Sequence, residues 1–321
     1  MDYISGWCKS QRELSGCTAI VTGSNTGIGK ETARDLYLRG ARVIIACRDT
    51  AKAEAAKKEI GEEGSAVPKK GVLIVEKLDL SSLKSVRDFS FRILANEPKI
   101  NILINNAGVM MCREGKTEDG FETHIGTNHY GHALLTLLLL PRLIKSAPSR
   151  IVCVSSYLHQ TYKVDVDNLN FEKTPYDPAK AYSVSKAANV LFAKALAQQL
   201  KEHNITGVTT YSLHPGVINT EIGRHFSETV WNGATWLFKN IMGWFVKTPK
   251  CGAQTTIYCA IDEGCANETG LYYCDCAVKT PSKQCQDEDL IAAFWDKTVA
   301  SLKLNVYDPF GNKDPEETLF K

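Results

Sequence analysis

The sequence has no apolar run long enough to cross a membrane and no recognisable export signal. Its longest apolar stretch, near Ala133 to Pro141, is far shorter than the roughly 18 residues that a spanning helix needs. The N-terminal residues contain no apolar core of the kind found in secretory signal peptides. We therefore expect a protein that is cytoplasmic or peripherally associated with intracellular membranes.

The sequence also lacks an excess of charge of one sign and any spacing typical of a metal site. Its 38 basic and 36 acidic side chains leave a formal net charge of +2, which gives no reason to expect nucleic acid as a partner. The 11 cysteines include no C-x-x-C pair, and no His or Cys cluster has the spacing of a zinc site. We expect reduced thiols and no bound metal.

What the sequence does have is an alternation of short β-branched runs with helical patterns. The runs fall at residues 19–22, 42–47, 72–78, 100–104, 150–154 and 206–213. This rhythm is typical of βαβ units and predicts a doubly wound parallel sheet, an α/β fold of the Rossmann type. The rhythm weakens after Leu213, where we expect structure that is specific to a ligand.

The first of these runs leads into a glycine-rich turn that opens a helix. Gly23, Gly27 and Gly29 have the spacing G-x-x-x-G-x-G. Glycines let the backbone turn tightly and approach a pyrophosphate, whose charge is stabilised by a helix N-terminus. The strand–turn–helix context favours a dinucleotide site over an ordinary turn.

Arg48 lies at the end of the second strand, 19 residues after Gly29. In dinucleotide folds an acidic residue near this distance binds the ribose 2′-OH of NAD, whereas an arginine accommodates the 2′-phosphate of NADP. We therefore predict NADP(H) as the cofactor. The alternative is that Arg48 is a solvated charge at a strand end, with Asp49 beside it.

Tyr182 and Lys186 form a Y-x-x-x-K pattern, which places a phenol and an ammonium one helical turn apart. The spacing alone is weak, because Tyr176 and Lys180 repeat it. Pro178 disfavours helical geometry at the residue before it, so the second pair is not expected to share a helix face. A phenol with a pKa near 10 needs a nearby cation to exchange protons at neutral pH.

The ordered motifs resemble those of the short-chain dehydrogenase/reductase family, across about residues 10 to 300. The resemblance rests on Thr22-Gly-x-x-x-Gly-x-Gly29, Asn105-Asn-Ala-Gly108, Asn128, Ser156, Tyr182-x-x-x-Lys186 and Pro215-Gly216-Val-x-x-Thr220. Three further segments are similar to the retinol dehydrogenase-like branch: Ala46-Cys-Arg-Asp49, Thr127-Asn-His-Tyr-Gly-His132 and Pro281-Ser-x-x-Cys-Gln-Asp-Glu288.

The resemblance implies a role for each matched residue. Tyr182 is the general acid/base, and Lys186 lowers its pKa while holding the nicotinamide ribose. Ser156, with Ser155 as the alternative, orients the carbonyl, and Asn128 completes a proton relay. The implied cofactor-binding residues, besides Tyr182 and Lys186, are Gly23, Asn25, Thr26, Gly27, Ile28, Gly29, Arg48, Asp79, Leu80, Asn106, Ala107, Gly108, Pro215, Gly216, Val217 and Thr220.

Residues 226–246 are rich in aromatic side chains, several of them near helical spacing. One interpretation is a helix that packs on the core or on a second subunit. The other is an apolar lid over a lipophilic substrate, in contact with a membrane surface as well. We favour the lid because the segment follows Thr220, beside the expected nicotinamide end.

We expect a single domain with an N-terminal segment 1–15, a dehydrogenase domain 16–305 with its lid near 221–250, and a tail 306–321. The implied reaction is the NADP(H)-dependent interconversion of a lipophilic alcohol and its carbonyl, first of all a retinoid. The alternatives are a reductase of another apolar carbonyl (steroid, isoprenoid or lipid aldehyde) and a non-catalytic NADP(H) sensor. The resemblance implies an N-terminal anchor helix in the membrane-bound relatives, and we expect none in this sequence. It also implies a possible homo-oligomer.

Overall fold

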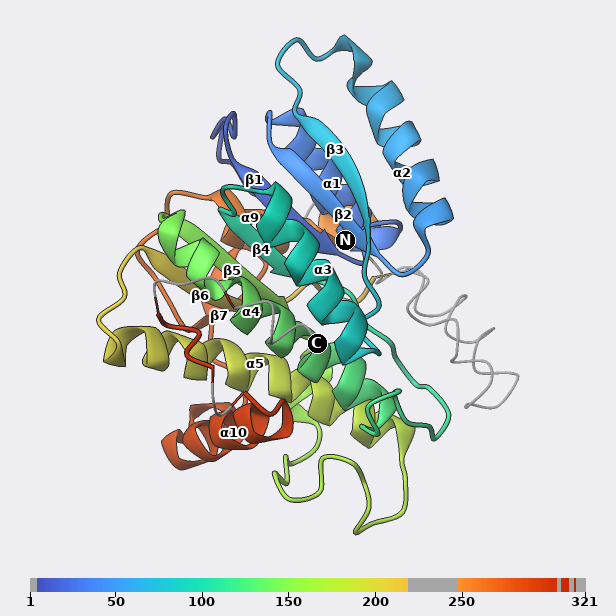
Figure 1. Cartoon of the computed structure of the whole chain (residues 1–321), viewed down its shortest axis with the longest axis vertical. Coiled ribbons are helices and arrows are strands. Elements are labelled where there is room, and N and C mark those ends of the chain that lie inside the picture. Colours follow the sequence, from blue (N-terminus) through green and yellow to red (C-terminus); the bar gives the residue numbers. More distant parts are fainter. Residues whose placement is uncertain (1–4, 219–246, 305–306, 312–314, 316–321) are drawn as a thin grey trace.

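Eight strands form one sheet in the computed structural model, which describes residues 5–218, 247–304, 307–311 and 315 (Figure 1). Their order across the sheet is β3-β2-β1-β4-β5-β6-β7-β8. Their bounds are β1 Thr18–Thr22, β2 Arg42–Cys47, β3 Val72–Lys77, β4 Ile102–Asn105, β5 Ser149–Val154, β6 Val208–His214, β7 Leu271–Cys274 and β8 Ala277–Lys279.

The strand order reverses direction between β1 and β4. Strands β1 to β7 run parallel, and only β8 pairs antiparallel, with β7. The chain moves outward from β1 to β3 and then returns to place β4 on the other side of β1. In open α/β sheets, ligands bind at the carboxyl ends of the strands beside such a switch point.

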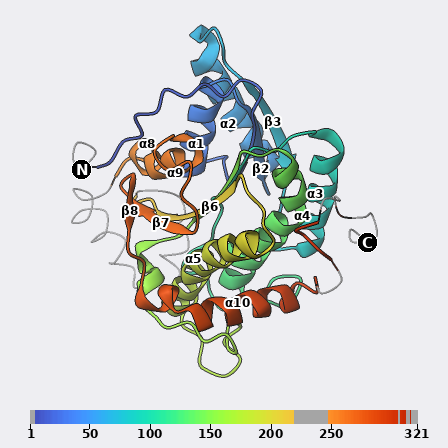
Figure 2. The same ribbon diagram turned by 90° about the vertical axis from the view of Figure 1, so that its left-hand side faces the viewer.

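Helices cover both faces of the sheet (Figure 2). One face carries α1, α2, α8 and α9, and the other carries α3, α4 and α5, with α10 packed on the outer side of α5. Their bounds are α1 Gly27–Leu38, α2 Thr50–Glu63, α3 Leu83–Asn96, α4 Gly131–Lys145, α5 Pro178–Glu202, α8 Pro249–Gly252, α9 Gln254–Ile261 and α10 Glu288–Ser301. A π-helical turn, Ile125–Tyr130, precedes α4, and short 3-10 helices lie at Gly64–Ala66, Tyr157–Gln160 and Lys283–Gln286.

The core divides into two layers because successive strand residues point to opposite faces. On β1, Ile20 belongs to the layer under α3, α4 and α5, whereas Ala19 and Val21 belong to the layer under α1 and α9. All five residues of β1 are buried. A central strand of a parallel sheet is covered on both faces, so it reads as a continuous apolar run rather than an alternation.

The structure confirms the doubly wound parallel sheet, and the six strands that the sequence predicts lie within two residues of their observed bounds. The helix that carries Tyr182 begins at Pro178, because Asp177 caps it. The β7–β8 hairpin was not predicted. Its turn contains Asp275 and Cys276, which both have positive φ. Thr220 and the aromatic segment 226–246 lie outside the described residues.

Candidate active site

The glycine loop lies at the carboxyl end of β1, in tight contact with the residues that follow β4. Gly23 has a φ of +63°, and a Cβ added there would lie 2.9 Å from the Cα of Ala107. A Cβ on Gly29 would lie 2.4 Å from Asn106 Nδ2 and 2.6 Å from the Gly23 oxygen. The two glycines are therefore required by the close packing of the loop against Asn106 and Ala107.

Helix α1 presents a free N-terminus beside this loop. Its first turn contains no acidic residue, and the side chain of the N-cap residue Thr26 makes no capping hydrogen bond. The N–H groups and the positive end of the helix dipole thus have no anionic partner from α1 itself. This arrangement fits the pyrophosphate of a dinucleotide.

The end of β2 also lies against the loop, since Cys47 Sγ is 3.6 Å from Asn25 Oδ1 in a thiol hydrogen bond. Arg48 follows at once and is exposed. The Asp49 carboxylate accepts a hydrogen bond of 3.0 Å from the Lys52 amide and so caps α2. Asp49 is thereby engaged by its own helix, and Arg48 is the charge available near the loop.

Thr22 connects the glycine loop to Asn128 through a buried histidine. The Thr22 hydroxyl accepts hydrogen bonds from the amides of Asn106 and Ala107, at 2.9 and 3.0 Å. His132 lies 2.9 Å from it through Nε2, and its Nδ1 donates to the Asn128 carbonyl oxygen at 2.9 Å. Burial lowers the pKa of His132 to about 4, so the ring is neutral and Nε2 accepts from the Thr22 hydroxyl.

The start of α5 fixes the positions of Tyr182 and Lys186. Asp177 is extended and accepts hydrogen bonds from the amides of Ala179 and Lys180, at 2.8 and 3.1 Å. Pro178 then occupies the first helical turn, where its missing N–H costs nothing. As the sequence predicts, Tyr176 lies before the helix and Tyr182 within it.

Tyr182 and Lys186 are both buried side by side. The Lys186 Nζ lies 5.8 Å from the centre of the Tyr182 ring and donates to the Val154 carbonyl at 3.2 Å. Burial lowers the pKa of Lys186 to about 8. Burial also raises the pKa of Tyr182 to about 12, although a hydrogen bond with the Ser156 side chain opposes the rise. At neutral pH the phenol is protonated, and the lowering of its pKa by Lys186 that the resemblance implies is not found in this structure.

The two serines after β5 have different surroundings. Ser155 is buried, and its hydroxyl donates to the Lys186 carbonyl at 2.7 Å, which anchors the sheet to α5. Ser156 is partly exposed, its hydroxyl accepts from the Leu158 amide at 3.2 Å, and its side chain interacts with Tyr182. Of the two hydroxyls, that of Ser156 is the one beside the Tyr182 phenol.

Asn128 lies on the π-helical turn before α4, fully buried. Its amide exchanges two hydrogen bonds with the Val109 backbone, at 2.8 and 3.0 Å, and donates to Ser185 Oγ at 2.9 Å. A Cβ on Gly108 would lie 3.2 Å from Asn128 Oδ1 and 3.3 Å from Lys186 Nζ. Asn128 and Lys186 therefore meet at Gly108, where β4 leads into the site.

A family model for short chain dehydrogenase matches residues 17–231 of the chain. The chain belongs to the short chain dehydrogenase family. It is 48% identical to retinol dehydrogenase 11 of Homo sapiens over 302 residues, which cover 94% of this chain and 91% of that protein. It is 47% identical to retinol dehydrogenase 12 of Homo sapiens over 294 residues, covering 92% and 89%. The dehydrogenase is thus an oxidoreductase of the retinol dehydrogenase-like branch, of the kind that acts on alcohols and carbonyls.

Solved structures show the same fold. An uncharacterised protein from Mycobacterium paratuberculosis superposes with a TM-score of 0.72 at 32% identity, over 93% of this chain and 98% of that one. A complex of Pseudomonas aeruginosa RhlG with NADP gives a TM-score of 0.60 at 26% identity, over 81% and 94%. Both cover most of the described sheet and its helices.

A second buried network, which the motifs do not reveal, supports the loop after Gly108. Glu122 and His124 are buried, with Oε1 and Nδ1 2.7 Å apart. His124 Nε2 accepts from the Cys112 amide at 3.1 Å, and the Tyr176 hydroxyl donates to the Cys112 oxygen at 2.9 Å. The His124 ring also lies edge-on to the Tyr182 ring, 6.3 Å between centres. No local spacing in the sequence identifies this network, because Cys112 and Tyr176 are 64 residues apart.

The remaining predicted site residues lie at the carboxyl ends of β3 and β6. Asp79 Oδ1 accepts from the Ser81 amide and hydroxyl, at 3.0 and 2.6 Å, in a local turn, and Leu80 is buried in the core. Gly216 has a φ of +98°, and the exposed Val217 accepts from the Lys247 amide at 2.9 Å. Thr220 lies outside the described residues.

No group of three or more His, Cys, Asp or Glu side chains in the described ranges could hold a metal ion. None of the helices built from these residues is both long and apolar enough to span a membrane.

Proposed function

We propose that this dehydrogenase interconverts a lipophilic alcohol and its aldehyde or ketone with NADP(H), and that its substrate is a retinoid. The observation that carries the proposal is the buried Tyr182–Lys186 pair with the Ser156 side chain against the phenol. That combination supplies a proton donor, a cation beside it and a hydroxyl for a carbonyl oxygen. The retinoid assignment comes from two similar relatives, retinol dehydrogenases 11 and 12 of Homo sapiens.

The cofactor assignment rests on the residues around the glycine loop. The loop between Gly23 and Gly29 and the free end of α1 fit a pyrophosphate. Arg48 stands where a 2′-phosphate would need a cation, and the nearby carboxylate of Asp49 is engaged with α2. The RhlG relative was solved with NADP, which supports the same choice here. The residues that hold the cofactor are those named from the motifs, with Arg48 at the 2′-phosphate.

NADP(H), when bound, supplies or accepts the hydride. In the reduction, the Ser156 hydroxyl binds the carbonyl oxygen and Tyr182 donates its phenolic proton to that oxygen. Lys186 stabilises the phenolate that remains, because its charge lies beside the ring in a buried site where electrostatic interactions are weakly screened. Asn128 positions the loop after β4 and helix α5 through its hydrogen bonds to Val109 and Ser185. His132 links Asn128 to Thr22 at the end of β1.

The rival substrate class is another apolar carbonyl, such as a steroid ketone, an isoprenoid aldehyde or a lipid aldehyde. The catalytic residues are the same for all of these, so the site geometry does not separate them. A panel of all-trans-retinal, farnesal, a steroid ketone and butanal, assayed by NADPH oxidation, tests the proposal. We expect the highest kcat/KM for retinal. A steroid or farnesal preference of tenfold or more would overturn the retinoid assignment, and a preference for NADH would overturn the cofactor assignment.

A further inference from the structure

A cavity of about 430 Å³ lies at the amino-terminal ends of the strands, opposite the end that carries the candidate active site. It is lined by residues at the amino ends of β4, β5 and β6, such as Ile102, Ser149 and Val208. The glycine loop, Ser156 and Gly216 follow the carboxyl ends of strands, so the cavity is separate from the proposed catalytic centre. Its size falls within the roughly 300–1,000 Å³ of pockets that bind small molecules.

Arg150 is a buried cation of this cavity, with a relative exposure of 6%. Its Nη1 donates to the Cys259 carbonyl at 3.1 Å, and its guanidinium lies over the Tyr211 ring, 5.9 Å from the centre. No carboxylate of the described residues lies within 4 Å of it, and Nε and Nη2 make no hydrogen bond to them. Neither nitrogen is among the fully buried polar atoms without a partner, so both are accessible to an acceptor that enters the cavity.

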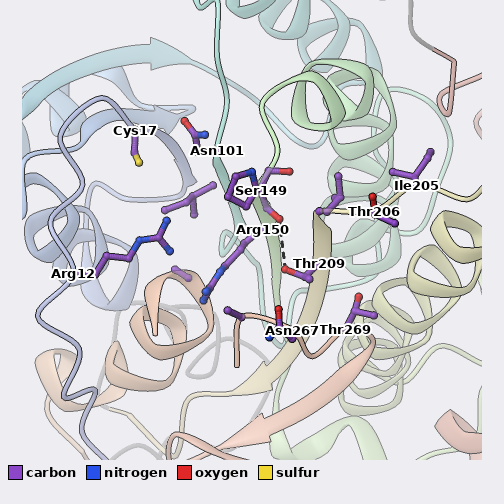
Figure 3. A pocket seen from close by; sticks show the side chains of 16 residues that line it. Arg12, Cys17, Asn101, Ser149, Arg150, Ile205, Thr206, Thr209, Asn267 and Thr269 are labelled. Carbon is purple, nitrogen blue, oxygen red and sulfur yellow. Dashed lines mark hydrogen bonds between the residues drawn. The ribbon is translucent and has the colours of Figure 1, made fainter. Parts of the chain in front are cut away.

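Arg12 brings a second guanidinium to the same cavity from the N-terminal segment (Figure 3). Its Nη1 donates to the Ile261 carbonyl at 3.5 Å, so both arginines reach the C-terminal end of α9. Capping those carbonyls is the structural role of the pair. The cap uses one nitrogen of each side chain and leaves the other N–H donors of both guanidinium groups for another acceptor.

Among the described residues, the acids near the end of α9 form no ion pair within 4 Å with the two arginines. Asp262 accepts hydrogen bonds from Cys8 Sγ at 3.6 Å and from the Gly264 amide at 2.9 Å. Glu263 is exposed and forms no ion pair within 4 Å among the described residues. Hydrogen bonds to its own backbone and to Ser10, with weaker attraction from Arg12 and Arg150, lower its pKa. The formal charges of Arg12, Arg150, Asp262 and Glu263 sum to zero, so the cavity offers an anion the unused N–H donors of the two guanidinium groups and not a net charge.

The rest of the lining combines apolar and neutral polar residues. Ile102, Pro148, Ile205, Val208, Ala260 and Ala266 provide the apolar part. Asn101, Thr209 and Asn267 add neutral hydrogen-bonding groups (Figure 3). We propose that this cavity binds a small organic monocarboxylate, whose carboxylate contacts Arg12 and Arg150 and whose apolar chain lies along Ile205 and Val208. A guanidinium pairs with a carboxylate through parallel N–H donors, and the apolar lining fits the chain of such a ligand.

Isothermal titration of the full chain with octanoate, and separately with 1-octanol and inorganic phosphate, tests this proposal at constant ionic strength. We expect saturable octanoate binding that the neutral alcohol and phosphate do not reproduce. Arg12→Gln should weaken octanoate at least tenfold. The matched control Arg87→Gln, on α3, should leave the affinity unchanged. Neither readout depends on catalysis, so a failure here is distinct from a failure of the proposed reaction.

A second variant distinguishes loss of the binding site from misfolding. Ala266→Phe fills the cavity from a partly exposed turn, and thermal melting checks that the protein still folds. We expect it to abolish octanoate binding. The proposal is overturned if octanoate does not bind, or if it binds equally well to Arg12→Gln and Ala266→Phe. Phosphate binding that is as tight as octanoate and lost in Arg12→Gln would replace the monocarboxylate with a phosphate ligand.

Discussion

Lys186 holds its ammonium nitrogen 5.8 Å from the centre of the Tyr182 ring, and the two side chains are only 2% and 5% exposed. Burial acts on them in opposite directions, raising the pKa of the phenol and lowering that of the ammonium. Both shifts favour the neutral forms. A change of charge at either group therefore changes the pKa of the other.

Removal of the Tyr182 hydroxyl should abolish most of the activity. We expect Tyr182→Phe to lower kcat by about 10²–10⁴-fold, the range for loss of a general acid, with NADPH affinity changed less than threefold. Tyr176→Phe is the matched control, because Tyr176 begins the other Y-x-x-x-K pattern but lies outside α5. It should keep kcat within about fivefold. Steady-state kinetics and fluorescence titration of NADPH measure both, and equal losses in the two variants would contradict the assignment.

The buried ammonium predicts a pH dependence of stability. The pKa of Lys186 is about 8 in the folded protein and 10.5 in its ordinary state. Between these values the unfolded chain binds more protons than the folded one, so folding becomes more favourable as pH rises. From pH 7 to 9.5 the free energy of unfolding of the wild type should rise by about 2 kcal/mol relative to Lys186→Met. Urea unfolding at both pH values measures this, and a pH-independent difference would contradict a depressed pKa.

Substitution of the two serines after β5 should affect different properties: catalysis for Ser156 and stability of the fold for Ser155. Ser156→Ala should lower kcat/KM by about 10²-fold through loss of a group that binds the carbonyl oxygen, with little change in melting temperature. Ser155→Ala removes the 2.7 Å hydrogen bond to the Lys186 carbonyl and should destabilise the fold by about 1 kcal/mol. Kinetics and thermal melting of both proteins distinguish the roles. The reverse pattern would identify Ser155 as the substrate-binding serine.

The glycine loop provides a paired test of cofactor binding. An alanine at Gly29 would place its Cβ 2.4 Å from Asn106 Nδ2 and 2.6 Å from the Gly23 oxygen. We expect Gly29→Ala to weaken NADPH at least tenfold and to lower the melting temperature. Gly61, within α2, has no atom within 4 Å of an added Cβ, so Gly61→Ala should stabilise by about 0.5–1 kcal/mol. Unaltered NADPH affinity in Gly29→Ala would contradict the site.

Arg48 tests the choice between the two nicotinamide cofactors. Replacement by Asp should remove the cation near the 2′-phosphate and add an acceptor for a 2′-OH. We expect Arg48→Asp to raise the Kd for NADPH at least tenfold while that for NADH falls or stays constant. Because Arg48 is exposed, the fold should be unaffected. An unchanged NADPH preference would show that Arg48 is only a solvated charge.

The sequence alone was sufficient for the features that depend on short-range spacing. The glycines after β1, the run of parallel strands and the placement of Tyr182 and Lys186 on one helix all follow from patterns within a few residues. Asp177 and Pro178 even separate Tyr182 from Tyr176, because capping and the geometry before proline are local properties. The order of these motifs along the chain is the order found in the family that the sequence resembles.

Only the tertiary structure decided which distant groups meet. It distinguishes Ser156 from Ser155, joins Thr22 to Asn128 through His132, and gives Tyr176 a structural place beside Glu122 and His124. It also brings Arg12 and Arg150 to one cavity at the amino-terminal ends of the strands. The direction of a side chain at a strand end, and the burial that shifts its pKa, depend on packing between layers that no local spacing records.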